Sequence, residues 1–375
     1  MKFTIDSRLF VNGIQFVGIN ERSTNTESPT EEQVEITITT NKLQMRTQGT
    51  AVEKTSAWLN CVADVSEPVT ITVEHQKLFD IVSSLSKRYA EIELSELKKE
   101  IQLKSGKTKS KLRKFEGVIP KRIENDVKSV FVVKRVELIK ALKTAKVTSG
   151  KNDVRHFLNG AFISYDNDGF IRVVSTDGHR LSASKMLVEH SENFEGKGII
   201  VTNRGLDYLL SYLHLCAEES VKIELDDDFC QCSINTGVSV KVRLVDGEYP
   251  DWRRIIPNGA RHLAVVRRLE LLSSMDSAIT FCSDKRVNTK FVIEGSSLSL
   301  TNKSDDGEYA DTIEVGGHDA PEKLEAGYNV HYLKDALQEL SDPLVMMCVD
   351  NDSTPMVITG NESQSCLMLV MPTRI

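Results

Sequence analysis

Residues 175–181, Ser-Thr-Asp-Gly-His-Arg-Leu, place hydroxyl groups, a carboxylate and an imidazole close together in the chain. These are the side-chain types of a serine hydrolase. Neighbours two residues apart on a turn orient one another poorly, however, and the chain has no Gly-x-Ser-x-Gly motif. Because Asp-Gly is a turn signal, the segment is expected to be a strand-ending loop. A nucleotide-processing hydrolase that uses Asp177 and His179 is the alternative interpretation.

Carboxylates also gather in residues 245–254, Val-Asp-Gly-Glu-Tyr-Pro-Asp-Trp-Arg-Arg. Their spacing does not fit the calcium loop, and a two-metal nuclease needs further carboxylates that the sequence does not single out. Cys230 and Cys232 would share one face of a strand, but a zinc site needs two more ligands at suitable spacing. The chain has no Walker A and no Gly-x-Gly-x-x-Gly motif. We therefore expect a protein that is not an enzyme and holds no metal or cofactor.

The same segments suit recognition. A pocket for a partner needs apolar side chains with a few polar groups at its rim. The motifs supply both kinds: apolar Leu158, Leu181, Pro250 and Ile255, and polar His179, Arg180 and Arg254. The tail, Val-Met-Pro-Thr-Arg-Ile, is largely apolar and carries a proline that cannot continue a helix or a central strand. A tail of this kind can line a groove.

Six segments with one shared pattern must position these residues. Each has a short β-branched strand, a polar turn and a helix with apolar residues at helical spacing, and they begin near residues 3, 69, 130, 199, 262 and 328. Alternating stretches between them, such as residues 221–225, 291–293 and 298–300, predict antiparallel hairpins. The pattern predicts an α+β fold of three similar domains, each with two helices packed on antiparallel sheets. Three unrelated α+β domains that share only this periodicity are the alternative.

Composition limits the class of protein. The 375 residues suffice for two or three domains, and 40% hydrophobic with 27% charged residues is typical of a folded protein. The apolar runs are too short to cross a bilayer, and the first residues, Met-Lys-Phe-Thr-Ile-Asp, contain no secretory apolar stretch. Seven scattered cysteines favour reduced thiols over a disulfide framework. We therefore expect a cytoplasmic protein.

Charge is distributed unevenly, although 47 Lys and Arg against 54 Asp and Glu give a net charge of −7. Residues 134–146 are basic, and helices of this kind that line the hole of a ring would hold a phosphate backbone without reading bases. Residues 98–114 are basic and residues 305–314 are acidic, so two copies can pair head to tail and close a ring. Ordinary solvated surface charge is the alternative for both features.

Residues 175–181, 245–257 and 370–375 together resemble the bacterial sliding clamp, the beta subunit of DNA polymerase III. Residues 153–160, Asp-Val-Arg-His-Phe-Leu-Asn-Gly, also resemble the stretch that precedes the family's Asp-Gly-His-Arg loop. The resemblance is good from about residue 127 to residue 375 and poor over the first 125 residues. It implies a non-catalytic processivity factor, placed on DNA by an ATP-driven loader. Domains at 1–126, 127–259 and 260–375 would form a head-to-tail ring dimer with twelve helices around duplex DNA.

The resemblance also implies partners and sites. The family binds the DNA polymerase III catalytic subunit, the clamp loader and other proteins through peptides similar to Gln-Leu-x-Leu-Phe, whose apolar residues enter a pocket. Carried over by motif, that pocket comprises Leu158, Thr176, Gly178, His179, Arg180, Leu181, Pro250, Arg254, Ile255, Met371, Pro372, Thr373, Arg374 and Ile375. The expected DNA contacts are Arg22, Lys134, Lys140, Lys143, Arg155, His156 and Phe157. The expected dimer interface comprises Lys107, Lys109, Leu112, Phe281, Asp305, Asp306 and Glu308.

The sequence departs from the family at three places. Thr373 stands where the family usually has a second methionine, which makes the pocket more polar there. Residues 20–29 form a polar segment where the family has an apolar loop, which weakens the case for Arg22. Ser110 replaces an aromatic residue at the ring interface and leaves Leu112 against Phe281, so we expect a salt-sensitive dimer. A scaffold that keeps the pocket without a closed ring is the alternative function.

Overall fold

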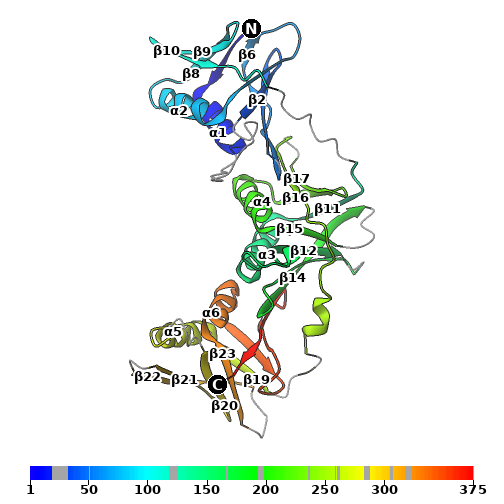
Figure 1. The fold of residues 1–375 in the computed structure, drawn as a ribbon, viewed down its shortest axis with the longest axis vertical. Coiled ribbons are helices and arrows are strands. Elements are labelled where there is room, and N and C mark those ends of the chain that lie inside the picture. The colour runs from blue at the N-terminus through cyan, green and yellow to red at the C-terminus, as the bar shows by residue number, and fades with distance from the viewer. Residues whose placement is uncertain are drawn as a thin grey trace. The chain divides into compact units, whose positions relative to one another are not determined.

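The computed structural model (Figure 1) describes residues 1–375 except 19–32, 50, 118–125, 166–167, 193–197, 235–236, 258, 260–261, 283–287, 305–306, 318–322 and 375. The described residues form two compact units. Unit 1 comprises Met1–Arg135, His190–Phe194 and Asp207–Leu244, and unit 2 comprises Val136–Glu189, Glu195–Leu206 and Val245–Ile375. Within the described ranges, no helix is long and apolar enough to span a membrane.

A strand runs directly into a helix at each of the six positions that the repeat predicts. The pairs are β1 (Lys2–Asp6) and α1 (Ser7–Val17), β7 (Val69–Glu74) and α2 (His75–Ser86), β11 (Ser129–Lys134) and α3 (Arg135–Thr148), β15 (Ile199–Thr202) and α4 (Asn203–Leu215), β19 (His262–Arg267) and α5 (Arg268–Ile279), and β23 (Leu324–Asn329) and α6 (Val330–Glu339). Polar side chains cap three of these helices in the described residues. Asp6 accepts from the Arg8 and Leu9 N–H groups of α1, the Thr202 hydroxyl accepts from the Gly205 N–H of α4, and Asn329 accepts from the His331 N–H of α6. The repeat and the α+β class are confirmed.

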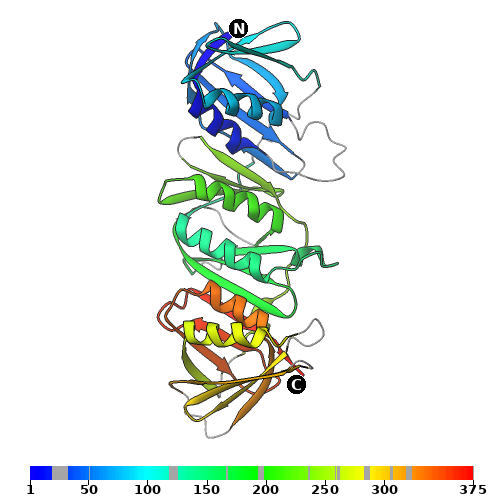
Figure 2. The ribbon, with the colours of Figure 1, turned by 90° about the vertical axis from the view of Figure 1, so that its left-hand side faces the viewer.

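Unit 1 holds two antiparallel sheets with α1 and α2 side by side on them (Figure 2). One sheet has the order β10-β9-β8-β1-β6, and the other β7-β2-β3-β4-β18-β17-β16-β11. Phe3, Phe10 and Met45 are among the side chains that fill the core between helices and sheets. The new strands are β2 (Gln33–Ile38), β3 (Lys42–Gln48), β4 (Val52–Thr55), β5 (Leu59–Asn60), β6 (Val62–Asp64), β8 (Glu91–Glu96), β9 (Glu100–Ser105), β10 (Thr108–Arg113), β16 (Ser220–Leu225), β17 (Phe229–Ser233) and β18 (Ser239–Arg243).

Unit 2 repeats this arrangement with α5 and α6 side by side (Figure 2). One sheet has the order β15-β12-β13-β14-β26-β25-β24-β19, and the other β22-β21-β20-β23-β27. Phe291 and Tyr328 meet edge to face in its core. The new strands are β12 (Gly160–Tyr165), β13 (Phe170–Thr176), β14 (Arg180–Glu192), β20 (Asn288–Glu294), β21 (Ser297–Ser304), β22 (Gly307–Glu314), β24 (Leu344–Val349), β25 (Met356–Gly360), β26 (Cys366–Val370) and β27 (Pro372–Thr373).

Two ladders join strands that are far apart in sequence. Residues 52–55 of β4 pair with residues 239–242 of β18, and residues 180–184 of β14 pair with residues 366–370 of β26. Each ladder extends one sheet across a boundary between the domains that the sequence predicts. A strand pair satisfies backbone groups of both partners, so each ladder ties together strands from two of the predicted domains.

An arginine at the start of a helix holds the far end of the neighbouring helix. Arg268 donates from Nε to the Asp342 carbonyl (2.9 Å) and from Nη1 to the Leu337 carbonyl (3.4 Å), at the end of α6. A cation near the C-terminus of a helix satisfies its last carbonyls and opposes its negative dipole. Ser7, the first residue of α1, has no cation and instead donates its hydroxyl to the Tyr89 carbonyl, just after α2. Arg135 makes the equivalent bonds at the end of α4, to Leu213 and Glu218.

Arg268→Met is expected to lower the free energy of unfolding by about 1.5–3 kcal/mol, because it leaves two half-buried carbonyls without their charged donor. The adjacent Arg267 is the matched control, since it is 59% exposed and pairs with Glu270 on the surface. Arg267→Met should change stability by less than about 0.5 kcal/mol. Urea unfolding of both variants measures the difference, and equal losses would contradict the assigned role.

A buried ammonium group lies at the end of α1. Lys54 is 7% exposed, donates to the Gly18 carbonyl (2.7 Å) and lies 5.0 Å from the centre of the Tyr208 ring. Burial lowers the pKa of Lys54 to about 8, since the charged form loses its water. Lys54 therefore joins the end of α1 to Tyr208 of α4 within unit 1. The burial of its charge lowers the stability of the folded chain.

The free energy of unfolding is expected to depend on pH because Lys54 titrates at different pH values in the folded and unfolded chain. Between pH 8 and about 10.5 the unfolded chain still binds a proton that the folded chain has released, so the free energy of unfolding rises with pH, by at most about 1.4 kcal/mol per unit. Lys54→Met should remove this rise, whereas the exposed control Lys42→Met should keep it. Urea unfolding of the three proteins at pH 7.5, 9 and 10 checks this. Parallel curves for wild type and Lys54→Met would contradict it.

Candidate functional site

The loop between β13 and β14 uses its polar groups to hold its own shape. Gly178 has φ +89°, a conformation that favours glycine. The Thr176 hydroxyl accepts from the Gly178 N–H (3.1 Å) and donates to the Arg180 carbonyl (2.6 Å). The Asp177 carboxylate accepts from the backbone N–H groups of His179 (2.9 Å) and Arg180 (3.0 Å). Asp177 thus bonds the His179 backbone and not its ring, so the geometry of a hydrolase triad is not formed.

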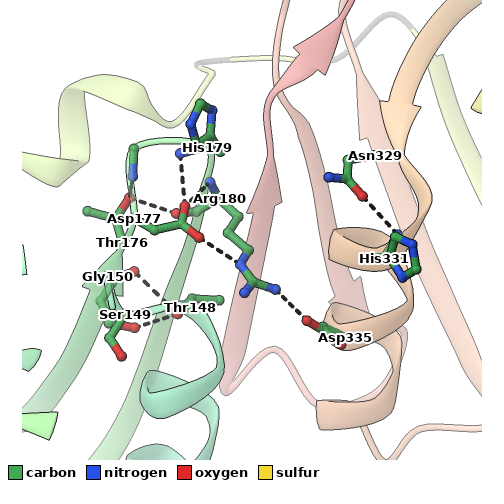
Figure 3. Close-up of polar contacts among 12 residues, drawn as sticks. Thr148, Ser149, Gly150, Thr176, Asp177, His179, Arg180, Asn329, His331 and Asp335 are labelled. Carbon is green, nitrogen blue, oxygen red and sulfur yellow. Dashed lines mark hydrogen bonds and ion pairs between the residues drawn. The ribbon is translucent and has the colours of Figure 1, made fainter. Parts of the chain in front are cut away.

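The Arg180 side chain connects the loop to α6 (Figure 3). Its Nε lies 3.0 Å from one Asp177 oxygen, and its Nη1 lies 2.6 Å from an oxygen of Asp335. The guanidinium carbon is 4.4 Å from the centre of the Tyr332 ring, which also stacks 6.4 Å from the His179 ring. Sequence reasoning missed Tyr332 and Asp335. Their spacing of three residues on one helix face is a signal, but only the fold brings that face to the loop.

Three buried hydroxyls support the loop from below. Thr148, Ser175 and Ser182 are each at most 1% exposed and bond to one another. Ser175 also donates to the Ala145 carbonyl (2.7 Å) in the last turns of α3. Because buried hydroxyls cost stability unless they are paired, this cluster fixes both strands that flank the loop relative to α3.

An apolar cluster forms the floor beside the loop. Leu158 and Leu181, both predicted for the pocket, are 2% and 1% exposed, and Met371 packs against them. Tyr249 and Trp252 also belong to this cluster, although only Pro250, Arg254 and Ile255 of their segment were predicted for the pocket. The other buried members are Val174, Ile200 and Leu369.

The segment from 249 to 255 supplies the outer wall. Tyr249 stacks 4.9 Å from Phe162, and burial raises the pKa of its hydroxyl. Trp252–Ile255 is a short 3-10 helix, in which Ile255 is 40% exposed and Arg254 pairs with Asp251 (2.9 Å). An exposed isoleucine next to a buried aromatic floor is suited to receive an apolar side chain.

The tail closes the site. The Met371 N–H donates to the His179 carbonyl (2.9 Å), and Pro372 and Thr373 form β27 at the edge of β23. A cavity of about 820 Å³ lies beside this strand, between Met371–Arg374, residues 325–327 and residues 352–353. The structure thus brings Leu158, Thr176, Gly178, His179, Arg180, Leu181 and the tail together. Ile375 lies outside the described residues.

The described residues expected to contact DNA lie on β11, on α3 and in the segment 155–157. On α3 and the strand before it, Lys134 and Lys143 are exposed, and Lys140 bonds to the Ser341 hydroxyl (3.0 Å). Arg155 is held by Asp153 (2.9 Å), and this pairing lowers the pKa of Asp153 to about 2. His156 is exposed, whereas Phe157 packs on the apolar floor. Arg22 lies outside the described residues.

Three of the expected interface residues, Lys109, Leu112 and Glu308, lie on the outer strands of the two five-stranded sheets. Lys109 is exposed on β10 and Glu308 on β22, Lys107 is exposed in the turn before β10, and Phe281 stacks 6.0 Å from Tyr309. Leu112 was expected to contact Phe281 of a second copy, but it is 7% exposed and packs in the core of its own domain. That expectation is wrong because β10 alternates, and its apolar face is turned inward. Asp305 and Asp306 lie outside the described residues.

The cysteines and carboxylates of the described residues form no group that could hold a metal ion. Cys230 and Cys232 do share one strand face, as expected, but that face is the core. Burial raises the pKa of Cys230 to about 12, so its thiol stays protonated and is a poor metal ligand.

Comparison with known proteins agrees with this geometry. Residues 132–251 match the family model for the DNA polymerase III beta subunit, central domain, and residues 253–374 match that for its C-terminal domain. The two matches cover about two thirds of the chain. The chain belongs to the DNA polymerase III beta subunit family. Membership gives it the function of a sliding clamp, a processivity subunit that is not itself catalytic.

Individual relatives extend the match to the first domain. The beta sliding clamp of Pseudomonas aeruginosa is 24% identical over all of both chains, and that of Escherichia coli K12 is 25% identical over 82% of this chain and 83% of the relative. The crystal structure of the DNA polymerase III subunit beta from P. aeruginosa superposes with a TM-score of 0.89 at 24% identity, over all of both chains. The structure from Thermotoga maritima has a TM-score of 0.86 at 22% identity, covering 100% of this chain and 99% of that one. The clamp fold therefore spans the whole of this chain.

Proposed function

We propose that two copies of this chain join head to tail into a ring around duplex DNA. The supporting observation is the pattern of strand pairing. Inside the chain, sheets are extended across predicted domain boundaries by the β4–β18 and β14–β26 ladders. Among the described strands, β10 pairs only with β9 and β22 only with β21, so both present an open edge. A second copy can continue each sheet through the same kind of ladder.

Charge supports the direction of this pairing. β10, Thr-Lys-Ser-Lys-Leu-Arg, has its three cations exposed, and β22, Gly-Glu-Tyr-Ala-Asp-Thr-Ile-Glu, has both glutamates exposed. Opposite charges across an interface favour the basic edge of one copy against the acidic edge of the other. Two edges of the same kind would repel. The domain boundaries at 126 and 259 fit this scheme, with one helix pair in each domain.

We propose that DNA contacts the ring through its phosphates. Lys134 and Lys143 are exposed cations that can neutralise phosphate without reading sequence. Arg155 is also exposed, but its charge is shared with Asp153. Lys140, tied to Ser341, would contribute less. Action on DNA would place the protein in the cytoplasm of a bacterial cell.

Partners such as the polymerase catalytic subunit and the clamp loader would dock at the candidate site through peptides similar to Gln-Leu-x-Leu-Phe. The apolar floor around Leu158 and Leu181 would take the peptide's Leu and Phe, and Arg180 with His179 would orient its backbone. The polar Thr373 in the wall would distinguish this site from those with methionine there.

Retention on DNA tests the ring. Loaded with a clamp loader onto a nicked circular plasmid, the protein is expected to stay bound through gel filtration at 150 mM NaCl, and to be lost once the plasmid is linearised, because a ring slides off a free end. Loss from both forms would favour a scaffold that does not close. Equal retention on both would indicate ordinary charge binding, and would contradict encirclement.

A further inference from the structure

A second cavity, of about 510 Å³, lies at the other end of the ladder that carries the candidate site. The β14–β26 ladder begins with Arg180 opposite Val370, beside the candidate site, and ends with Ser184 opposite Cys366. Ser184 and Cys366 line this second cavity, together with residues of α3 and the segment that precedes β26. Its volume is within the range of ligand pockets, and its lining shares no residue with the site proposed for partner peptides.

The cavity is preformed by bonds that fix its walls. The Asp342 carboxylate accepts from the N–H groups of Glu362 (3.1 Å) and Ser363 (2.9 Å), which holds the segment before β26. The Lys185 N–H then donates to the Ser365 carbonyl (2.7 Å), which ties that segment to β14. Gly360 is required here, because a Cβ atom would lie 2.4 Å from the Asp342 carboxyl group. A ligand would therefore find the cavity already built and would lose little affinity to ordering it.

One wall of the cavity is apolar and open to solvent. Phe170 lies opposite Leu187 in the β13–β14 register, and both line the cavity. Leu187 is 56% exposed although it belongs to a regular strand. Ala141 and Met186 add buried apolar surface deeper in the cavity. Such a wall favours a large apolar side chain over water.

The charged groups of the lining favour a negative partner. Lys140 and Lys185 are its cations, and Glu137 is its one acid. Lys185 is held 5.7 Å from the centre of the Phe170 ring, and Lys140 is held by Ser341. The lining therefore carries more positive than negative charge, with one ammonium group beside the Phe170 ring of the apolar wall. A carboxylate beside an apolar anchor would complement both features.

We propose that this cavity is a second docking site, for a segment of a partner protein that inserts a large apolar side chain and presents a carboxylate beside it. Duplex DNA fits the cavity less well, because a phosphate backbone has no side chain to fill an apolar pocket. The two docking sites lie at opposite ends of one short ladder, so both can be occupied at once. The proposal does not depend on ring closure or on the nature of the first site.

Peptide binding to the full chain tests the proposal. The probe is a fluorescein-labelled peptide, Asp-Glu-Phe-Leu-Asp-Glu, and its amide counterpart, Asn-Gln-Phe-Leu-Asn-Gln, shows the contribution of charge. We expect saturable binding of the acidic probe, at least fivefold tighter than that of the amide form. An excess of unlabelled Gln-Leu-Ser-Leu-Phe should change its affinity by less than twofold.

Variants locate the binding. Leu187→Asp should weaken the acidic probe at least tenfold and Lys185→Glu at least fivefold, while Lys87→Glu, an exposed lysine outside the lining, serves as the matched control and should have no effect. Both cavity side chains are exposed, so the variants are expected to fold. Absence of saturable binding, or displacement by Gln-Leu-Ser-Leu-Phe, would overturn the proposal. So would variants that reduce retention on circular DNA and leave the probe's affinity unchanged, since the lysines would then serve DNA.

Discussion

Arg180→Ala is expected to weaken the binding of a labelled Gln-Leu-Ser-Leu-Phe peptide by at least tenfold. The Arg180 side chain is 11% exposed and is held by Asp177, by Asp335 and by the face of Tyr332. Its removal leaves two carboxylates without their cation and frees the loop from α6, so the residues that orient the peptide backbone lose their fixed positions. Fluorescence anisotropy with the full chain measures the affinity.

Two further proteins make this result specific. Arg172→Ala is the matched control, because Arg172 pairs with Asp168 in the bend before β13 and lies outside the site; it should change the affinity by less than twofold. Deletion of residues 371–375 should abolish binding, because it removes β27 and the Met371 contact with His179. Thermal unfolding checks that each variant is folded. Wild-type affinity for Arg180→Ala would exclude the loop from the site, and no binding by the intact chain would reopen the scaffold and enzyme interpretations.

The helices were predictable from sequence because each one depends on local periodicity. The stripe of Leu333, Ala336 and Leu337, for example, is set by the helical repeat alone and faces the core of unit 2. The strands that start the six repeats were predictable for the same reason, because the β-branched residues that favour a strand lie within one short segment.

The candidate site was predictable only in part. Its loop and tail stand out as motifs, but Arg180 reaches Asp335 because β14 pairs with β26, and that pairing joins residues about 185 apart in sequence. No local pattern encodes such a partner. Leu112 shows the converse failure, since its alternating neighbours reveal two faces of β10 but not which face is buried.

Reversing two charges on β10 is expected to break the dimer that we propose. Lys109→Glu with Lys111→Glu puts acids opposite the exposed Glu308 and Glu314 of a second copy, and should weaken dimerisation at least a hundredfold in 150 mM NaCl. Sedimentation velocity over a concentration series measures the dissociation constant. Exposed lysines elsewhere, Lys42→Glu with Lys87→Glu, give the same change in net charge and should leave the dimer intact.

A complementary chain shows whether the pairing is head to tail. Glu308→Lys with Glu314→Lys should also yield monomers, because two basic edges then face each other. Mixed with the β10 variant, it should restore dimers, since each chain's β10 then meets an opposite charge on the other chain's β22 at both contacts of the ring. Because Leu112 is committed to its own core, charge carries much of this association, and molar salt should weaken the wild-type dimer at least tenfold. An equally tight dimer in low and molar salt, or no rescue in the mixture, would show that another surface joins the copies.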